Sequence, residues 1–196
     1  IYMPMIPEAV VAMLACGRIG AIHSVVFGGF ASNELASRID DSKAKILITA
    51  SCGFEPGRTV EYRPLVDGAL KLAKHKVEKV ILFQRKDHEI KLNKPLEISW
   101  EEALSGASNK ACVEMGANDY AYILYTSGTT GVPKGILRDI GGHIVGLKWT
   151  MKNIYDIDPT DIWWSASDIG WIVGHSYIVY GLSLIHISEP TRQSKI

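Results

Sequence analysis

The sequence lacks three features, and each absence excludes a class of protein. It has no excess charge, since Lys plus Arg and Asp plus Glu both number 21, which argues against a dedicated nucleic-acid binder. Its three cysteines, Cys16, Cys52 and Cys112, are too far apart for a disulfide framework or a CxxC metal site, which predicts a reducing, intracellular compartment. The longest apolar run near the start, residues 9–16, is eight residues long, whereas a membrane span needs about 18–20. We therefore expect a soluble domain with no membrane span.

The two ends of the sequence look artificial. The chain begins at Ile1 without an initiator Met, so any targeting segment would lie upstream. At the other end, LSLIHISEPTR (residues 182–192) resembles the translation of an adapter used in sequencing libraries. We therefore expect a partial domain over residues 1–181 and a non-native tail over residues 182–196. The alternative is a genuine amphipathic tail.

Helical and strand patterns alternate along the chain, which is typical of an α/β fold with a mostly parallel sheet and helices on both faces. No repeat and no linker divides it. Residues 85–95 are polar and end in Pro95, which predicts an exposed loop. Helices are expected over residues 7–18, 33–41, 64–76, 140–155 and 174–180 and over a short stretch after Ser99, and Ser32 is the expected N-cap of the second helix. Strands are expected over residues 21–27, 45–50, 79–83, 120–125 and 161–165, and a further strand is expected to end within residues 1–4.

The most informative stretch is YTSGTTGVPKG, residues 125–135, which directly follows an expected strand. Its hydroxyls and bare backbone N–H groups suit a polyphosphate, and Lys134 adds a positive charge. Pro133 stands where the common NTPase loop requires Gly before Lys, and GxGxxG is absent. The pattern therefore indicates a phosphate-binding loop of another type, and the alternative is a flexible Ser/Gly turn.

This loop resembles the phosphate loop of the adenylate-forming enzymes. Residues 20–41, the EPGR of residues 55–58, and SASDIGWIVGHSYIVYG over residues 165–181 resemble short-chain acyl-CoA synthetases of the acetate and propionate type. Residues 138–155 are more similar to propionyl-CoA synthetases than to acetate enzymes. The resemblance covers essentially all of residues 1–181.

The resemblance implies an acid–thiol ligase that uses ATP. Such an enzyme joins a carboxylate to the AMP part of ATP, which forms an acyl-adenylate and releases pyrophosphate. It then transfers the acyl group to the CoA thiol with release of AMP. Catalysis of the first step depends on positioning and charge stabilisation. Thr129 and Lys134 would be catalytic, and the β- and γ-phosphates would be held by Thr126, Ser127, Gly128, Thr129, Thr130, Gly131 and Lys134.

Two other segments would hold the remaining substrates. The resemblance implies CoA contacts at Glu55, Pro56, Gly57, Arg58 and Val173, where Arg58 suits phosphates; without it, EPGR would be interpreted as a simple Pro-Gly turn. It implies an acyl pocket at Trp171, Ile172, Val173 and Gly174, a short apolar slot. Val173 in place of the Thr often found in acetate enzymes favours propionate. By pattern alone the segment would be core packing.

Other tempting residues are interpreted as structural. His23, His143 and His175 are expected to pack or cap. The pairs Asp40-Asp41 and Glu101-Glu102 are expected to be charged helix ends, and Trp163-Trp164 to alternate across a strand.

The resemblance also implies parts that lie beyond residue 181. Mg²⁺ would be required, but its glutamate ligand and the adenylation lysine would lie downstream, so no metal ligand is expected here. We expect ATP, CoA and a short-chain carboxylate as small-molecule partners, no nucleic acid, and a mitochondrial-matrix or cytoplasmic location. The chain alone is expected to be inactive and marginally folded. The alternatives are a non-catalytic ATP-binding module and an adenylating ligase for another acid.

Overall fold

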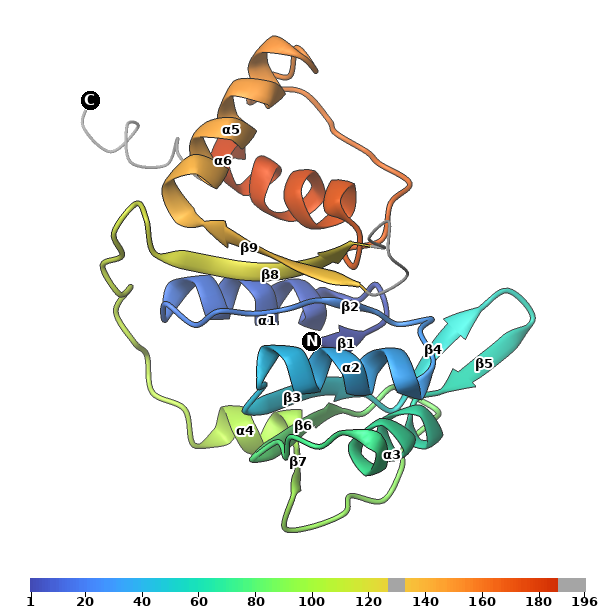
Figure 1. Cartoon of the computed structure of the whole chain (residues 1–196). Coiled ribbons are helices and arrows are strands. Elements are labelled where there is room, and N and C mark those ends of the chain that lie inside the picture. The colour runs from blue at the N-terminus through green and yellow to red at the C-terminus, as the bar shows by residue number, and fades with distance from the viewer. Residues whose placement is uncertain (127–132, 187–196) are drawn as a thin grey trace. The chain divides into compact units, whose positions relative to one another are not determined.

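The computed structural model describes residues 1–126 and 133–186, apart from the side chains of residues 185 and 186 (Figure 1). The chain divides into two compact units, Ile1–Val113 and Glu114–Ile196, hereafter unit 1 and unit 2. Each unit is described by itself.

Unit 1 is built on a five-stranded parallel sheet with the strand order β2-β1-β3-β6-β7. The expected strands at residues 45–50 and 79–83 are confirmed, and β3 and β6 pair over their whole length. The strand expected over residues 21–27 is wrong in extent, since only its last two residues pair with β1. The strands are β1 (Tyr2–Met3), β2 (Val26–Phe27), β3 (Ile46–Ala50), β6 (Lys79–Phe83) and β7 (Glu97–Ser99).

Four helices accompany this sheet: α1 (Pro7–Arg18), α2 (Ser32–Ser42), α3 (Arg63–Leu72) and α4 (Trp100–Ser105). In α1, proline begins the helix, Glu8 lies in the first turn and Arg18 in the last, each favourable for the helix dipole. In α4, Ser99 Oγ accepts a hydrogen bond from the Glu102 backbone N–H at 3.0 Å, so the predicted cap is confirmed.

Two helix ends differ from expectation because side chains make long-range bonds. Ser32 does not cap α2; it is the first helical residue, and its hydroxyl donates to the Leu65 carbonyl of α3 at 2.8 Å. Helix α3 ends at Leu72 and not at residue 76, because Ala73 is extended and the His75 N–H donates to Asp40 Oδ1 at 2.7 Å. Sequence periodicity carries no information on such distant partners.

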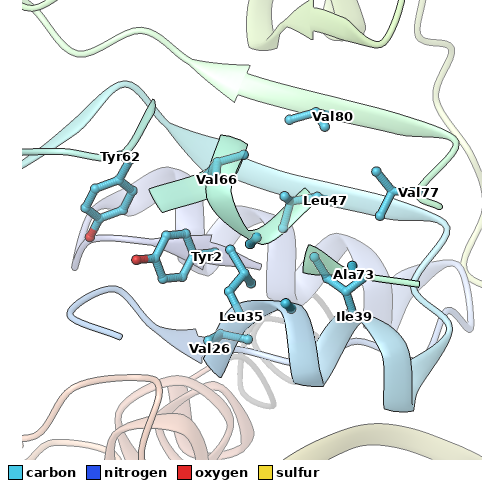
Figure 2. Packing of buried hydrophobic residues seen from close by; sticks show 12 residues of the cluster. Tyr2, Val26, Leu35, Ile39, Leu47, Tyr62, Val66, Ala73, Val77 and Val80 are labelled. Atoms are coloured by element: carbon cyan, nitrogen blue, oxygen red, sulfur yellow. The ribbon is translucent and has the colours of Figure 1, made fainter. Parts of the chain in front are cut away.

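The main core of unit 1 lies where α2 and α3 pack against the sheet (Figure 2). Tyr2 of β1 stacks at 5.0 Å from Tyr62, while Leu35 of α2 and Val66 of α3 fill the space beside them. The buried residues of α1 take no part in this cluster. Parallel crossovers are right-handed, and the step from β1 to β2 runs opposite to the step from β2 to β3, so α1 covers the other face of the sheet. The α/β fold with helices on both faces is thus confirmed.

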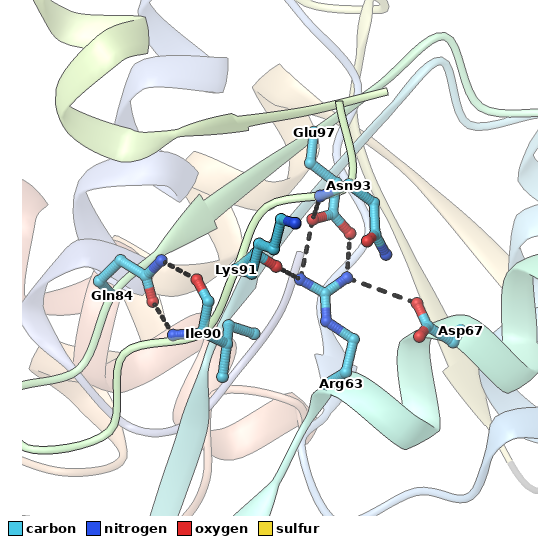
Figure 3. Close-up of polar contacts among 7 residues, drawn as sticks. All are labelled: Arg63, Asp67, Gln84, Ile90, Lys91, Asn93 and Glu97. Carbon is cyan, nitrogen blue, oxygen red and sulfur yellow. Dashed lines mark hydrogen bonds and ion pairs between the residues drawn. The ribbon is translucent and has the colours of Figure 1, made fainter. Parts of the chain in front are cut away.

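A buried ion pair joins α3 to strand β7 (Figure 3). The Arg63 guanidinium binds both oxygens of Glu97, with Nη2 to Oε2 at 2.8 Å and Nη1 to Oε1 as the second bond. The Asn93 N–H also donates to Glu97 Oε2 at 2.7 Å, and Arg63 Nη2 donates to the Lys91 carbonyl at 2.9 Å. These hydrogen bonds fix the backbone in the second half of the polar stretch 85–95. As expected, this stretch forms no helix or regular strand.

Unit 1 also carries an antiparallel hairpin, β4 (Cys52–Glu55) and β5 (Arg58–Glu61), joined by Pro56 and Gly57.

Unit 2 contains a second antiparallel hairpin, β8 (Tyr120–Thr126) and β9 (Lys134–Asp139), followed by helix α5 (Ile140–Asn153), the π-helix η1 (Gly174–Gly181) and α6 (Leu182–His186). The strand expected at residues 120–125 and the helix at 140–155 are confirmed within two residues. Strand β9 was not anticipated. The strand expected at residues 161–165 is wrong: those residues are irregular, and Ile162 is 97% exposed, so no partner strand covers it.

No helix in the described ranges is long and apolar enough to cross a membrane.

Candidate functional site

The hairpin β8–β9 presents the two ends of the candidate phosphate loop opposite each other. Thr126 is the last residue of β8, Lys134 is the first residue of β9, and the two are paired in register. The glycine-rich stretch therefore connects the two strands of a hairpin, which holds its two ends at the spacing of neighbouring strands. Ser127, Gly128, Thr129, Thr130 and Gly131 lie outside the described residues.

Lys134 is exposed at the end of this hairpin where the connecting loop joins the two strands. Within the described ranges, no carboxylate lies within 4.0 Å of its ammonium group. The sequence placed Lys134 at the end of the loop, and the structure shows it as the first residue of strand β9, which is hydrogen-bonded to β8. A strand-held lysine is a better defined point charge for an anion than a loop lysine.

The predicted CoA residues Glu55, Pro56, Gly57 and Arg58 form the turn of the β4–β5 hairpin in unit 1. Gly57 has φ +79°, a conformation that glycine adopts at little cost and that follows proline in a type II turn. Arg58 Nη2 lies 2.6 Å from Glu55 Oε2, and the Arg58 side chain is 70% exposed. The Pro-Gly turn expected from composition is therefore present, and it displays a guanidinium paired with a carboxylate.

The predicted acyl-pocket residues form a tight turn before η1. Trp171 N–H donates to the Asp168 carbonyl at 3.0 Å, and Gly174 N–H donates to Ser167 Oγ at 3.2 Å. A Cβ on Gly174 would stand 2.1 Å from the Asp168 carbonyl oxygen, so only glycine fits. Trp171, Ile172 and Val173 keep substantial exposed surface, so the core-packing interpretation is wrong for these three side chains and right for Gly174.

Behind this turn lies a buried group of rings, here called the ring cluster: Tyr122 of β8, His143 of α5, and His175 and Tyr180 of η1. Tyr122 is fully buried; its Oη lies 3.1 Å from His143 Nδ1, and its ring centroid lies 4.1 Å from that of His175. Tyr180 stacks parallel to Tyr122 at 6.3 Å. The cluster therefore packs α5 and η1 onto the same face of the β8–β9 hairpin.

Burial controls the charges around the ring cluster. It lowers the pKa of His143 from 6.5 to about 4, helped by the positive charge of Arg138, so the imidazole is neutral near pH 7. Burial raises the pKa of Tyr122 and that of Asp168, whose carboxylate accepts the Gly170 N–H at 2.7 Å. The burial of the His175 ring and the neutral His143 imidazole agree with the structural interpretation of both residues.

The other residues that pattern singled out act in the framework. Asp40 accepts the backbone N–H of His75, which lowers the pKa of this carboxyl, and Glu102 binds Lys94 Nζ at 2.7 Å. Trp163 packs on Tyr155 at 4.9 Å, whereas Trp164 is 81% exposed. Their side chains therefore differ in burial as expected, although the segment is not a strand. Among the described residues, no group of three or more His, Cys, Asp or Glu could hold a metal ion.

Sequence reasoning missed the role of Tyr122 and Asp168. The signal for Tyr122 was present in the alternation of β8, in which Tyr122 and Leu124 are buried and the residues between and beside them, 121, 123 and 125, are only partly buried. Nothing local distinguishes Asp168, because its burial depends on the η1 turn.

Comparison with known proteins shows which family this chain matches. A family model described as "AMP-binding enzyme" matches residues 1–186. The mitochondrial acyl-CoA synthetase short-chain family member 3 of Rattus norvegicus is 54% identical over 187 residues, which are 95% of this chain and 27% of that protein. The acetyl-coenzyme A synthetase of Shewanella sp. (strain MR-4) is 48% identical over 202 residues, covering 99% of this chain and 31% of that protein.

A solved structure of acetoacetyl-CoA synthetase from Streptomyces lividans superimposes with a TM-score of 0.78 at 26% identity, over 92% of this chain and 27% of that one. The chain thus spans less than a third of the length of each of these relatives.

Proposed function

Because the chain belongs to the family of AMP-binding enzymes, we propose that it forms part of a synthetase that ligates a short-chain carboxylate, propionate or acetate, to CoA with ATP. The observation that carries this proposal is the hairpin β8–β9, which holds Thr126 and the exposed cation Lys134 on either side of a Ser/Thr/Gly connection. The named relatives, an acyl-CoA synthetase and an acetyl-CoA synthetase, support the choice of reaction. The mitochondrial matrix or the cytoplasm would be its location.

In the proposed first step, a carboxylate oxygen attacks the α-phosphorus of ATP and the bond to the bridging oxygen of the β-phosphate breaks. Pyrophosphate then leaves with the electron pair of that bond. Thr126 and the residues of 127–131 would donate hydrogen bonds to the β- and γ-phosphates, and the Lys134 ammonium would offset their charge. Bound Mg²⁺ would supply further charge neutralisation, and its protein ligand is expected outside this chain.

In the proposed second step, the CoA sulfur attacks the acyl carbon and AMP leaves as a stabilised phosphate. Arg58 would contact the nucleotide phosphates of CoA. Its present partner Glu55 is half exposed, and exposed ion pairs contribute only about 0–1 kcal/mol, so a phosphate can replace the carboxylate at little cost. Val173 would lie near the pantetheine arm.

For the acid, the proposed pocket is lined by Trp171, Ile172, Val173 and Gly174. Gly174 permits the chain to turn against the Asp168 carbonyl, which leaves the three apolar side chains at the surface of the turn. A methyl group on Val173 in place of a hydroxyl favours propionate over acetate, because it removes a polar group from an apolar slot.

Acid-dependent pyrophosphate release by the full-length protein from the source locus, measured over C2 to C8 acids, tests the proposal. We expect the highest kcat/KM with propionate or acetate. Highest activity with medium-chain or aryl acids would instead indicate a ligase for another acid. ATP binding without pyrophosphate release for any acid would indicate a non-catalytic ATP-binding module.

Replacing Thr129 tests the loop itself. Thr129→Ala removes one donor to the departing phosphates and should slow adenylation by about 10²–10³-fold. Transfer from a preformed acyl-adenylate to CoA should change little. Thr129→Ser keeps the hydroxyl and is the matched control. Equal losses in both half-reactions would contradict a phosphate-holding role.

A further inference from the structure

The segment 171–174 is held from two sides. On one side, the α-carbon of Gly174 lies against the Asp168 carbonyl, where not even a methyl group fits. On the other side, the His175 ring packs on the Tyr122 ring, with centroids 4.1 Å apart. Two backbone hydrogen bonds also hold the segment. The Trp171 N–H donates to the Asp168 carbonyl at 3.0 Å, and the His175 N–H donates to the Trp171 carbonyl at 2.9 Å. Because the Asp168 backbone leaves no space on the opposite side, we expect a shift of the His175 ring to move Trp171–Val173.

The position of the Tyr122 ring depends in turn on α5. Its hydroxyl is hydrogen-bonded to His143 Nδ1 at 3.1 Å, and the two rings meet edge to face at 4.9 Å. Tyr122 also lies four residues before Thr126 on the same strand. One fully buried side chain thus contacts the helix that follows the hairpin and the π-helix that follows the 171–174 turn. Short π-helical segments are frequent at functional sites of proteins.

We propose that Tyr122, His143 and His175 are positioning residues for the acyl-binding segment, and that they determine which carboxylic acids are accepted. His143 holds the Tyr122 ring, Tyr122 holds the His175 ring, and His175 in turn fixes the position of Trp171–Val173. None of the three contacts substrate. This inference rests on the proposed function.

The test is steady-state kinetics of the full-length enzyme with acetate, propionate and butyrate. His175→Ala removes the ring that packs on Tyr122, and we expect kcat/KM for propionate to fall about 10- to 100-fold, as misplacement of a binding segment does. The ratio of propionate to butyrate activity should change, while KM for ATP stays within about twofold. His175→Phe restores a ring on Tyr122 and should recover most of the selectivity.

Tyr122→Phe keeps the ring and removes the hydroxyl that is hydrogen-bonded to His143 Nδ1. It should change the acid selectivity in the same direction by roughly fivefold, the effect of one hydrogen bond. Tyr177→Phe is the matched control, because Tyr177 of η1 donates a similar hydrogen bond to Thr150 Oγ1 of α5 at 3.2 Å without contacting the Tyr122–His175 pair. Its acid selectivity should equal that of the wild type.

The outcomes separate the two proposals. An active wild-type enzyme whose His175→Ala and Tyr122→Phe variants fold but lose activity equally for all three acids would overturn the positioning role alone. A change of selectivity in Tyr177→Phe as large as that in Tyr122→Phe would also overturn it. A folded wild-type enzyme inactive on every acid would overturn the proposed function and the positioning role with it.

Discussion

At the scale of single residues, long-range polar contacts decide where elements of unit 1 begin and end. Asp40 on α2 accepts the His75 N–H and stops α3, and Ser32 on α2 donates to the Leu65 carbonyl of α3. Glu97 of β7 is only 1% exposed, and its carboxylate forms an ion pair with the Arg63 guanidinium of α3 (Figure 3). Each contact joins segments more than 30 residues apart.

Glu97→Gln should destabilise the chain by about 3–5 kcal/mol, because it leaves the Arg63 charge partly buried without its anion. Urea unfolding of the chain, followed by circular dichroism, measures the change. Glu102→Gln is the control: the Lys94–Glu102 pair is exposed, so its loss should cost about 0–1 kcal/mol. Equal effects of the two substitutions would show that burial of the Arg63–Glu97 pair is unimportant.

His143 should make stability depend on pH. Its pKa is about 4 in the folded chain and near 6.5 when unfolded, so the unfolded state binds the proton more readily. The contribution is fully present above pH 6.5 and is lost as pH falls through about 4, by roughly 3 kcal/mol at most. We expect the difference in unfolding free energy between wild type and His143→Gln to shrink over this interval. A difference constant from pH 7 to 4 would contradict the lowered pKa.

At the scale of elements, two helical glycines differ in the space that a side chain would find beside them. Gly174 begins η1 against the Asp168 carbonyl, whereas Gly146 lies within α5 and has no atom within 4 Å of its would-be Cβ. The same substitution should therefore have opposite signs at the two sites.

Gly174→Ala should destabilise unit 2 by about 1–3 kcal/mol, because the Asp168–Ile169 backbone must move to admit the methyl group. Gly146→Ala, the matched control, should stabilise it by about 0.5–1 kcal/mol, since alanine is the better helix former. Thermal melting of both variants checks the two signs. A stabilising Gly174→Ala would mean that the 168–174 turn is looser than the structure indicates.

At the scale of the whole molecule, unit 2 carries much apolar surface in one stretch. Ile154, Ile162 and Trp164 are 63%, 97% and 81% exposed. Apolar side chains gathered at a surface promote association in water. The neighbouring Trp163, in contrast, is packed against Tyr155.

Trp164→Ser should reduce self-association of the chain without lowering its melting temperature, because the indole makes little contact within the fold. Sedimentation velocity over a concentration series measures the association. Trp163→Ser should instead lower the melting temperature, because it removes a packed ring. A lowered melting temperature in Trp164→Ser would place that indole in the packing of unit 2.

The α/β fold, the strands expected at residues 45–50 and 79–83, the limits of α1 and the start of α4 followed from local patterns, because the spacing of apolar residues and the residues at helix ends can be recognised in the sequence. The candidate phosphate, CoA and acyl segments followed from resemblance to a family, and their roles stay predictions. Strand β9 was not predicted from the sequence, because its exposed residues show no alternation of apolar and polar side chains. The opposite error occurred at residues 161–165, where an apolar pattern predicted a strand but the residues are irregular. Only tertiary structure decided that Lys134 stands in a strand opposite Thr126, and that Tyr122, His143 and His175 meet. These contacts join residues far apart in sequence, and their free energy exists only once the elements have packed.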